Sequence, residues 1–371
     1  MEGKLLGHYL VLTGAISNAG DFLIGHRLQA LLEHLRPDRQ VLMFDRRQPL
    51  DPDSKDVRQA SAIIFGGGPA WQPNVYPAIY PLTQDLETIG SPLIPIGLGW
   101  KGRFTDPGSI RRYRFMPNAR PLLERIERDG FAGTCRDFPT LEVLQHAGLT
   151  RQEMGGCPAW YALDSLGTSP AVPHEISSIA ISPGALHMRH PSFADQARAL
   201  LQWGADRFAD ATRIAVFHHP LDGAPNLSHN AVAAQQALAH AATSFGYEVR
   251  DVSGTADDMM SLYTQVDLHI GYRVHAHILR CSLRRPSILL AEDARGVGAA
   301  EALGGQAIMA IATPPKLVRP WMPIRPSKSM LEELSRLLET EVDRGWPQVH
   351  NSGVTIDRTF AVTKRVIEAL P

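Results

Sequence analysis

Short apolar runs alternate with segments of helical spacing along the chain. The first half predicts strands at 8–13, 40–44, 61–65 and 91–99, and helices at 21–35 and 137–148. Strands that alternate with amphipathic helices are typical of parallel sheets, because parallel neighbours need a long connection between them. The pattern therefore predicts a parallel sheet with helices on both faces.

The same pattern restarts after a break at 166–175, a segment with two prolines, a glycine and no periodicity. Beyond it, strands are predicted at 176–182, 213–219, 247–252, 266–271 and 286–291, and helices at 193–208, 230–246, 257–265, 274–283 and 359–370. We predict an α/β fold of two Rossmann-like domains facing a cleft, with mostly parallel sheets, at 1–168 and 175–350. A C-terminal helix at 355–371 could pack back on the N-terminal domain.

Composition and charge narrow the functional class. Of the 371 residues, 44% are hydrophobic and 20% are charged, which is typical of a soluble globular protein and excludes a disordered chain or a coiled coil. The net charge of −1 gives no general basic surface, so we expect no nucleic-acid partner. The three cysteines form no C-x-x-C pair, no apolar run approaches the ~18 residues of a membrane helix, and the N-terminal stretch is too short and mixed for a signal peptide. We therefore expect a cytoplasmic protein.

Candidate ligand-binding residues follow the predicted strands, because ligands of parallel sheets bind at the carboxyl ends of the strands. After the first strand, Gly20 lets the backbone approach a ligand, and Asn18 can both donate and accept hydrogen bonds. Asp21 could cap the following helix or take a proton from a substrate hydroxyl. Gly67 and Gly68 follow the third strand and suit a phosphate, a sugar or a tight turn.

Two further loops of the first half are candidates for a dinucleotide site and an anion site, respectively. Gly97, Gly99 and Gly102 form a G-x-G-x-x-G pattern, but no predicted helix opens directly after it, so the pattern does not favour a dinucleotide site. Arg136 stands at the end of a further short strand, where it could bind an anion or pair with the adjacent Asp137.

The strongest signal of the second half stands where the strand at 266–271 ends. Gly271 is followed by Arg273, and then by His275 and His277 at the start of a predicted helix. The free N–H groups of a helix N-terminus attract anions and Arg273 adds a charge, so the segment predicts a phosphate or carboxylate site. The two histidines are two positions apart and cannot face the same way, so only one of them should line the cleft. Two core histidines are the alternative.

Three more residues lie where ligand-binding residues are expected. Arg295 follows the next strand and could reach the same anion or form a surface ion pair. His187 follows the first strand of the second half, and His218 stands at the end of the next strand. No pair of histidines at i, i+4 spacing accompanies a carboxylate there, so no metal site is predicted.

Taken in order, these residues resemble the polysaccharide pyruvyl transferase family. The resemblance rests on the segments 18–21, 66–68, 97–99, 136–137 and 271–275, and it covers about residues 8–305. The chain departs from the family at Cys157, where members often have aspartate, and at Arg295, where they often have lysine. The resemblance implies a GT-B-like fold and an enzyme that transfers the carbon skeleton of phosphoenolpyruvate to two hydroxyls of a sugar, forming a cyclic ketal and releasing phosphate.

The implied activity assigns a role to each candidate residue. Phosphoenolpyruvate is a polyanion, so Arg136, Arg273 and Arg295 are expected to bind this donor, with Gly271 beside them. His275 is the expected general acid, which protonates the methylene carbon, and Asp21 is the expected base. The residues expected on the acceptor side are Asn18, Gly20, Gly67, Gly68, His187 and His218.

The expected partners follow from this activity. They are a small-molecule donor, phosphoenolpyruvate, and a sugar or glycolipid acceptor from polysaccharide biosynthesis. Phosphoenolpyruvate is a co-substrate, and we expect neither a cofactor nor a metal. A membrane-linked acceptor could bring peripheral contact with a membrane. Two alternatives stay open, namely a GT-B glycosyltransferase with a nucleotide-sugar donor and a glycan-binding protein without turnover. The sequence predicts no oligomeric state.

Overall fold

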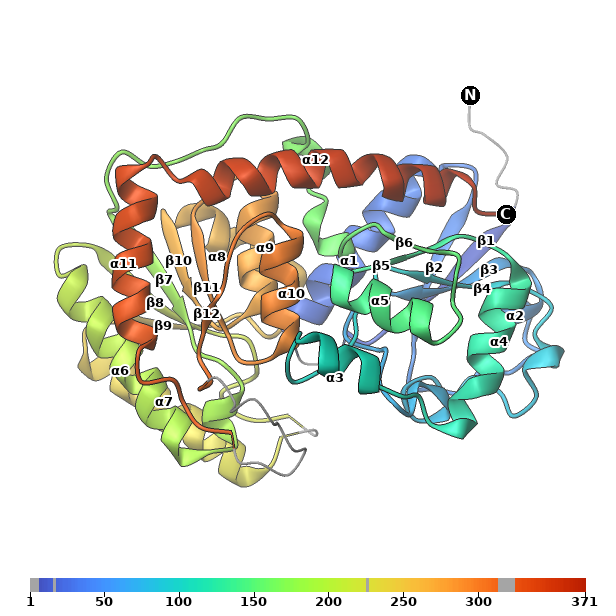
Figure 1. Ribbon diagram of the computed structural model, residues 1–371, viewed down its shortest axis with the longest axis horizontal. Coiled ribbons are helices and arrows are strands. Elements are labelled where there is room, and N and C mark those ends of the chain that lie inside the picture. Colours follow the sequence, from blue (N-terminus) through green and yellow to red (C-terminus); the bar gives the residue numbers. More distant parts are fainter. Residues whose placement is uncertain (1–6, 16–17, 225–226, 313–323) are drawn as a thin grey trace. The chain divides into compact units, whose positions relative to one another are not determined.

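The computed structural model describes residues 7–15, 18–224, 227–312 and 324–371 (Figure 1). Backbone contacts divide the chain into two compact units. Unit 1 comprises the segments Met1–Ile16, Asp21–Leu166 and Thr355–Pro371, and unit 2 comprises Ser17–Gly20 and Gly167–Val354.

Unit 1 is built on a parallel sheet with the strand order β2-β1-β3-β4. The strands are β1 (His8–Thr13), β2 (Gln40–Asp45), β3 (Ala60–Gly66) and β4 (Leu93–Ile96). Beyond β4, the Gly97 N–H donates to the Thr134 carbonyl at 2.8 Å, which joins the sheet to β5 (Gly133–Cys135) and its parallel partner β6 (Gln152–Met154). The central strand β1 is buried from His8 to Leu12, as expected for a parallel strand covered on both faces.

The helices of unit 1 come from both ends of the chain. They are α1 (Ala19–Leu35), α2 (Lys55–Arg58), α3 (Pro107–Arg112), α4 (Arg120–Asp129) and α5 (Phe138–His146), together with the second part of α12 (Pro347–Glu368). On α12, Thr363 donates to the Gly155 carbonyl at 2.7 Å, and the Tyr161 hydroxyl donates to the same carbonyl at 2.5 Å. The Tyr9 hydroxyl of β1 donates to the Pro371 carbonyl at 3.0 Å. The C-terminal residues are therefore an integral part of unit 1.

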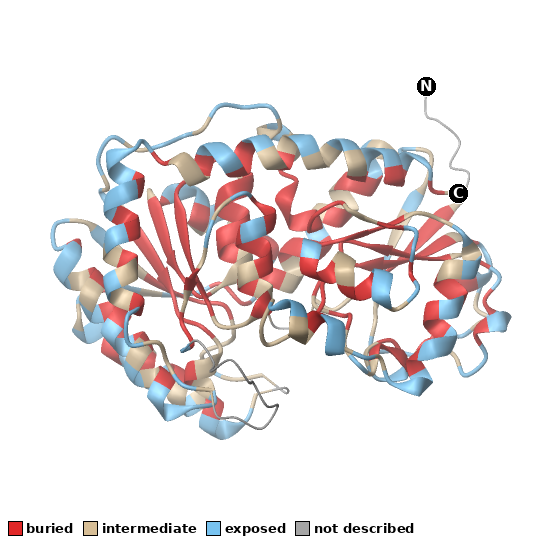
Figure 2. Ribbon diagram, in the orientation of Figure 1, coloured by how far each residue is buried: buried red, intermediate tan, exposed pale blue. Residues whose placement is uncertain are grey.

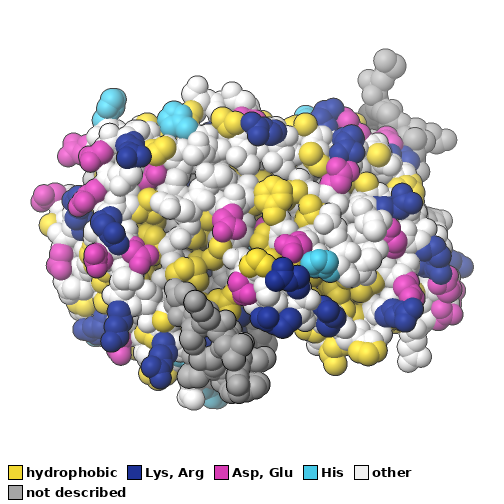
Figure 3. Space-filling model, viewed as in Figure 1, with side chains coloured by type: hydrophobic (Ala, Val, Ile, Leu, Met, Phe, Trp, Pro, Cys, Tyr) yellow, Lys and Arg dark blue, Asp and Glu magenta, His cyan; other side chains and the backbone are white. Residues whose placement is uncertain are grey.

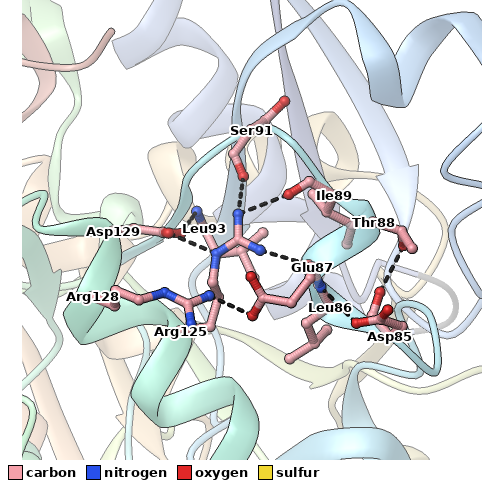
Figure 4. A network of polar contacts seen from close by, with 10 residues as sticks. All are labelled: Asp85, Leu86, Glu87, Thr88, Ile89, Ser91, Leu93, Arg125, Arg128 and Asp129. Carbon is pink, nitrogen blue, oxygen red and sulfur yellow. Dashed lines mark hydrogen bonds and ion pairs between the residues drawn. The ribbon is translucent and has the colours of Figure 1, made fainter.

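A buried arginine on α4 ties the segment between β3 and β4 to the helix (Figure 4). Arg125 is 7% exposed, and its Nε lies 2.6 Å from Oδ1 of Asp129. Its other nitrogens donate to the carbonyls of Leu86, Ile89 and Ser91. By donating to three backbone carbonyls, the arginine fixes the course of an irregular segment.

Unit 2 is built on a six-stranded parallel sheet with the order β12-β11-β10-β7-β8-β9. Its strands are β7 (Ser178–Ser182), β8 (Thr212–Phe217), β9 (Glu248–Asp251), β10 (Leu268–Gly271), β11 (Ser287–Ala291) and β12 (Ile308–Met309). Its helices are α6 (Pro191–Arg207), α7 (His229–Ser244), α8 (Ala256–Gln265), α9 (Val274–Ser282), α10 (Ala294–Ala302), α11 (Met330–Asp343) and the first part of α12. Figure 1 shows α8, α9 and α10 on one side of this sheet and α6, α7 and α11 on the other. Both faces are therefore covered, and the central strands are buried in Figure 2.

Each strand and helix named in the sequence analysis has a counterpart in the structure, and two of them differ by more than two residues at one end. The strand predicted at 91–99 ends at Ile96, because Gly97 adopts a left-handed backbone with φ of 68° that turns the chain. The helix predicted at 359–370 begins at Pro347. The structure adds helices that were not predicted, of which α4 and α11 are the longest.

Candidate functional site

The carboxyl edge of the unit 2 sheet brings the residues predicted around the anion site together. β10 ends at Gly271, where a Cβ would lie 2.4 Å from the Ser182 carbonyl oxygen, so only glycine allows the backbones of β10 and β7 this approach. Arg273 is the N-cap of α9. Its Nε donates to the Pro183 carbonyl at 2.7 Å and its Nη2 to the Gly184 carbonyl at 3.1 Å. The guanidinium is therefore held by the loop that follows β7.

The charge of Arg273 is only partly balanced by its protein surroundings. Burial lowers the pKa of Arg273 to about 10, and the nearby Glu292 carboxylate acts in the opposite direction. Glu292 accepts hydrogen bonds from the Ala185 and Leu186 backbone N–H groups, with distances of 2.8 to 3.0 Å. Burial also raises the pKa of Glu292. At neutral pH, Arg273 is thus a fixed cation in a site of reduced polarity, where an anion gains more than it would in water.

The N-terminus of α1 meets the same edge within unit 2. A Cβ on Gly20 would lie 2.3 Å from Nδ1 of His275, so glycine is required for the half-buried imidazole to lie against α1. The Ala19 N–H donates to the His218 carbonyl at 3.3 Å, and Asn18 Oδ1 accepts from the Gly20 N–H at 3.3 Å. The structure therefore places Asn18, Gly20, His218 and His275 next to one another.

Three buried histidines of this unit belong to the core. His218 Nε2 lies 2.8 Å from the hydroxyl of a buried tyrosine. His269 bridges Ser182 and Ser287 at 2.8 Å each, and His277 Nδ1 lies 2.9 Å from the same Ser287 hydroxyl. Burial lowers the pKa of His277 to about 4, and it lowers the pKa of His218 and of His269 well below the usual value. These three side chains are therefore neutral at the pH of an ordinary assay.

His187 lies in a short helical turn after β7 and is 3% exposed. Within the described residues, neither of its ring nitrogens makes a hydrogen bond. Burial, with a further contribution from the charge of Arg273, lowers the pKa of His187 to about 3. Its protonation is therefore coupled to unfolding, because only the unfolded chain binds the proton near pH 6.5.

We expect His187→Leu to reduce the acid sensitivity of the fold. The depressed pKa of His187 stabilises the native state above pH 6.5, and this contribution is lost as the pH falls toward 3. Between pH 7 and pH 5, the free energy of unfolding of the variant should decrease by about 1–2 kcal/mol less than that of the wild type. Urea unfolding at the two pH values measures the difference. The control is His190→Leu on the same loop, since His190 is exposed. An equal pH dependence of wild type and His187→Leu would contradict the prediction.

Two of the predicted donor-binding arginines are engaged in ion pairs. Arg295 makes a bidentate contact with Asp293, with nitrogen–oxygen distances of 2.7 to 3.0 Å. Arg136 in unit 1 is 2% exposed, and its Nε lies 3.0 Å from Oδ2 of Asp137. The Trp100 carbonyl accepts a further hydrogen bond from Arg136 at 3.3 Å. At both positions the contacts are those of the ion pair named as the alternative to anion binding.

The carboxyl edge of the unit 1 sheet holds the remaining predicted residues. Gly67 and Gly68 have φ values of 59° and 78°, a left-handed backbone that favours glycine. Asp21 lies in the first turn of α1. Burial raises the pKa of Tyr80, and the charge of Asp21 acts in the same direction. Arg46 also stands at this edge, directly after β2, and was not among the predicted site residues. Its signal in the sequence is a cation just after a predicted strand, as for Arg136 and Arg273. Arg46 Nη1 lies 3.4 Å from the position of a Cβ on Gly68.

Positive charge on the surface of unit 1 is concentrated around α3. Dark-blue side chains gather there in Figure 3, and the exposed cations of this part of the chain are Lys101, Arg111, Arg112, Arg114 and Arg120. This is a local concentration in a chain with a net charge of −1. Within the described ranges, no group of three or more His, Cys, Asp or Glu side chains is arranged to hold a metal ion. The described helices include none with the length and hydropathy to cross a membrane.

Comparison with known sequences decides the family. The sequence model of a family described as polysaccharide pyruvyl transferase matches residues 18–294. The match includes Gly67 and Gly68 of unit 1 and the Arg273–His275 segment of unit 2. The chain belongs to the polysaccharide pyruvyl transferase family. It is therefore a transferase by family. No curated protein matches this chain in sequence.

Solved structures show what the fold of this chain resembles. S. aureus MnaA, determined with UDP, aligns with a TM-score of 0.57 at 10% identity over 96% of this chain and 94% of that chain. The UDP-GlcNAc 2-epimerase of Methanocaldococcus jannaschii aligns with a TM-score of 0.50 at 9% identity over 96% and 99%. That of Neisseria meningitidis aligns with a TM-score of 0.50 at 8% identity over 97% and 99%. At these identities the likeness concerns the fold alone, and it confirms the predicted α/β, GT-B-like class with parallel sheets.

Proposed function

We propose that this family member transfers pyruvate from phosphoenolpyruvate to two hydroxyls of one sugar and releases phosphate. The observation that carries the proposal is the pairing of Arg273 with His275 at the start of α9. A fixed cation that binds an anion thus stands two residues from a side chain that can give a proton. The family match supports pyruvyl transfer, and the charge of the site suits this particular donor.

The donor carries a phosphate and a carboxylate, and unit 2 offers it two kinds of group. Arg273 can bind one anionic group through the edge of its guanidinium that the Pro183 and Gly184 carbonyls leave open. The free backbone N–H groups at the start of α9 can bind the other. Arg295 forms an ion pair with Asp293. We therefore propose that Arg295 contributes to the electrostatic potential around the donor rather than contacting the donor directly.

The chemistry then follows from the donor. His275 gives a proton to the methylene carbon of phosphoenolpyruvate, which becomes a methyl group, and the neighbouring carbon becomes electrophilic. A sugar hydroxyl attacks that carbon and loses its proton to a base, for which we propose Asp21, the residue after Gly20 on α1. Phosphate leaves with its bonding electrons, and the second hydroxyl attacks the same carbon and gives its proton to the released phosphate. The products are the cyclic ketal and inorganic phosphate.

An assay of phosphate release tests the proposal directly. The purified chain is incubated with phosphoenolpyruvate and a panel of sugars, and in parallel with nucleotide sugars and the same panel. We expect phosphate release that depends on both phosphoenolpyruvate and an acceptor, together with a product whose mass exceeds that of the acceptor by one ketal-linked pyruvate. Release of nucleotide in the parallel arm, with none from phosphoenolpyruvate, would establish a glycosyltransferase instead. Sugar binding without turnover of either donor would establish a glycan-binding protein.

A further inference from the structure

Arg46 follows β2 directly and lies at the carboxyl edge of the unit 1 sheet, where none of the roles assigned so far uses it. Its backbone N–H donates to the Thr13 carbonyl at the end of β1, at 2.9 Å. A Cβ on Gly14 would lie 2.5 Å from Cζ of Arg46 and 2.6 Å from its Nη2. Glycine at position 14 is therefore what allows the guanidinium to lie over the end of β1.

Two further neighbours complete the surroundings of this guanidinium. Its Nη1 lies 3.4 Å from the position that a Cβ on Gly68 would take. Its Cζ lies 5.9 Å from the centre of the Tyr80 ring, a cation–π distance. Tyr80 is 1% exposed, whereas Arg46 is half-buried. The guanidinium is thus fixed between two glycine loops and an aromatic ring and is partly shielded from water.

No protein carboxylate neutralises Arg46 among the described residues, where its guanidinium has no salt bridge. The adjacent acid, Asp45, is engaged by Arg47, with nitrogen–oxygen distances of 2.9 and 2.7 Å. A half-buried cation without a carboxylate is costly unless an anion or water completes its contacts. Because Gly14 and Gly68 have no side chains, the guanidinium itself lies close to both loops, and an anion bound to it would lie next to their backbones.

We propose that Arg46 binds an anionic group of the acceptor sugar, a carboxylate or a phosphate, at the carboxyl edge of the unit 1 sheet. The inference rests on the proposed function, in which Arg273 binds the donor and a sugar is the acceptor. An arginine favours this class of ligand because its planar guanidinium matches both oxygens of a carboxylate or phosphate. The acceptor is therefore an acidic sugar or a sugar phosphate rather than a neutral one.

Binding of defined sugars to the full-length chain, without phosphoenolpyruvate, tests this assignment. The probes are glucose, glucuronic acid and glucose 1-phosphate, and titration calorimetry measures their affinity. We expect the wild type to prefer an anionic probe over glucose, and the preference should weaken as the salt concentration rises. The glucuronic acid and glucose 1-phosphate arms distinguish a carboxylate from a phosphate. An equal affinity for all three probes would overturn the proposal.

Variants locate the effect at Arg46. Arg46→Gln should weaken binding of the preferred anionic probe about 10- to 100-fold and leave glucose unaffected, because one charge-assisted contact is lost. Arg46→Lys should recover part of the affinity, since it keeps the charge but not the planar geometry. Arg47→Gln is the matched control on the neighbouring exposed pair and should bind as the wild type does. Thermal unfolding of each variant confirms that the fold is retained.

Binding of phosphoenolpyruvate to the same variants distinguishes an acceptor role of Arg46 from a donor role. If Arg46→Gln weakens phosphoenolpyruvate binding and leaves the anionic sugar unaffected, Arg46 belongs to the donor site and the proposal is wrong. If the anionic sugar depends on Arg46 while phosphoenolpyruvate never yields phosphate, the acceptor site stands and the proposed function fails. The two failures are therefore distinguishable.

Discussion

His275→Ala should reduce the rate of phosphate release from phosphoenolpyruvate by about 10²- to 10⁴-fold, with the fold intact. The reason is that removal of a general acid leaves the methylene carbon to be protonated by water. Donor affinity should fall much less, because Arg273 and the start of α9 still hold the anion. Steady-state kinetics with varied phosphoenolpyruvate separates the two effects, since the loss should appear in kcat and hardly in KM.

The pH profile sharpens this prediction. A general acid acts only in its protonated form, so the wild-type rate should fall on the alkaline side of its profile. His187, with a pKa of about 3, and His277, with a pKa of about 4, are already neutral above pH 6, so they cannot cause that limb. The limb should be absent from the residual activity of His275→Ala. His277→Ala, two residues further along α9, is the control. It removes a buried contact with Ser287 and should lower stability while the folded enzyme keeps its rate. A wild-type rate in His275→Ala would rule out the proposed acid.

Arg136→Ala should lower the free energy of unfolding of unit 1 by about 3–5 kcal/mol, because it leaves the buried carboxylate of Asp137 without its cation. Asp137 also caps α5 by accepting a hydrogen bond from the Thr140 N–H at 2.9 Å, so the helix start should be disturbed as well. Urea unfolding followed by circular dichroism measures the loss.

An exposed ion pair provides the control for Arg136. Arg47 is 50% exposed and makes a similar contact with Asp45, yet Arg47→Ala should cost only about 0–1 kcal/mol. The folded fraction of Arg136→Ala can then be tested for phosphoenolpyruvate binding. Affinity equal to that of the wild type would make Arg136 structural, whereas a loss of tenfold or more would support the donor-binding role. An unfolding free energy unchanged from the wild type would contradict the ion-pair account.

The sequence predicts the parallel α/β fold well because strands that are buried on both faces consist mostly of apolar residues. β1, β3 and β11 are continuous apolar runs, and β10 ends in the glycine that its neighbour requires. The start of α12 left no such trace, since the residues from Pro347 to Arg358 include Gly353 and several polar side chains. Their helix depends on packing: Gly353 lies against the side chain of Arg284 and accepts a hydrogen bond from it.

The sequence could predict which residues stand near the site, but not which charged side chains form ion pairs with one another. A cation or glycine after a strand can be read from the sequence, which identified Gly20, Arg273 and His275. Whether such a cation is already paired depends on the rotamer and on neighbours brought in by the fold. Arg136 and Arg46 illustrate this, because both follow strands and both have an adjacent aspartate in the sequence. The first is paired with its aspartate, and the second is not, since Arg47 engages that carboxylate instead.

The division of α12 between the two units has a consequence for the order in which the protein folds during synthesis. Residues 355–371 leave the ribosome after the whole of unit 2, yet they supply unit 1 with Thr363, Val366 and Ile367, which are at most 2% exposed. Unit 2 can close its sheet while unit 1, translated first, still lacks part of its core. The nascent chain therefore carries an open apolar surface near Tyr161 until residues 355–371 have been synthesised, and a chaperone that covers such surfaces would be needed longest by the domain that is made earliest.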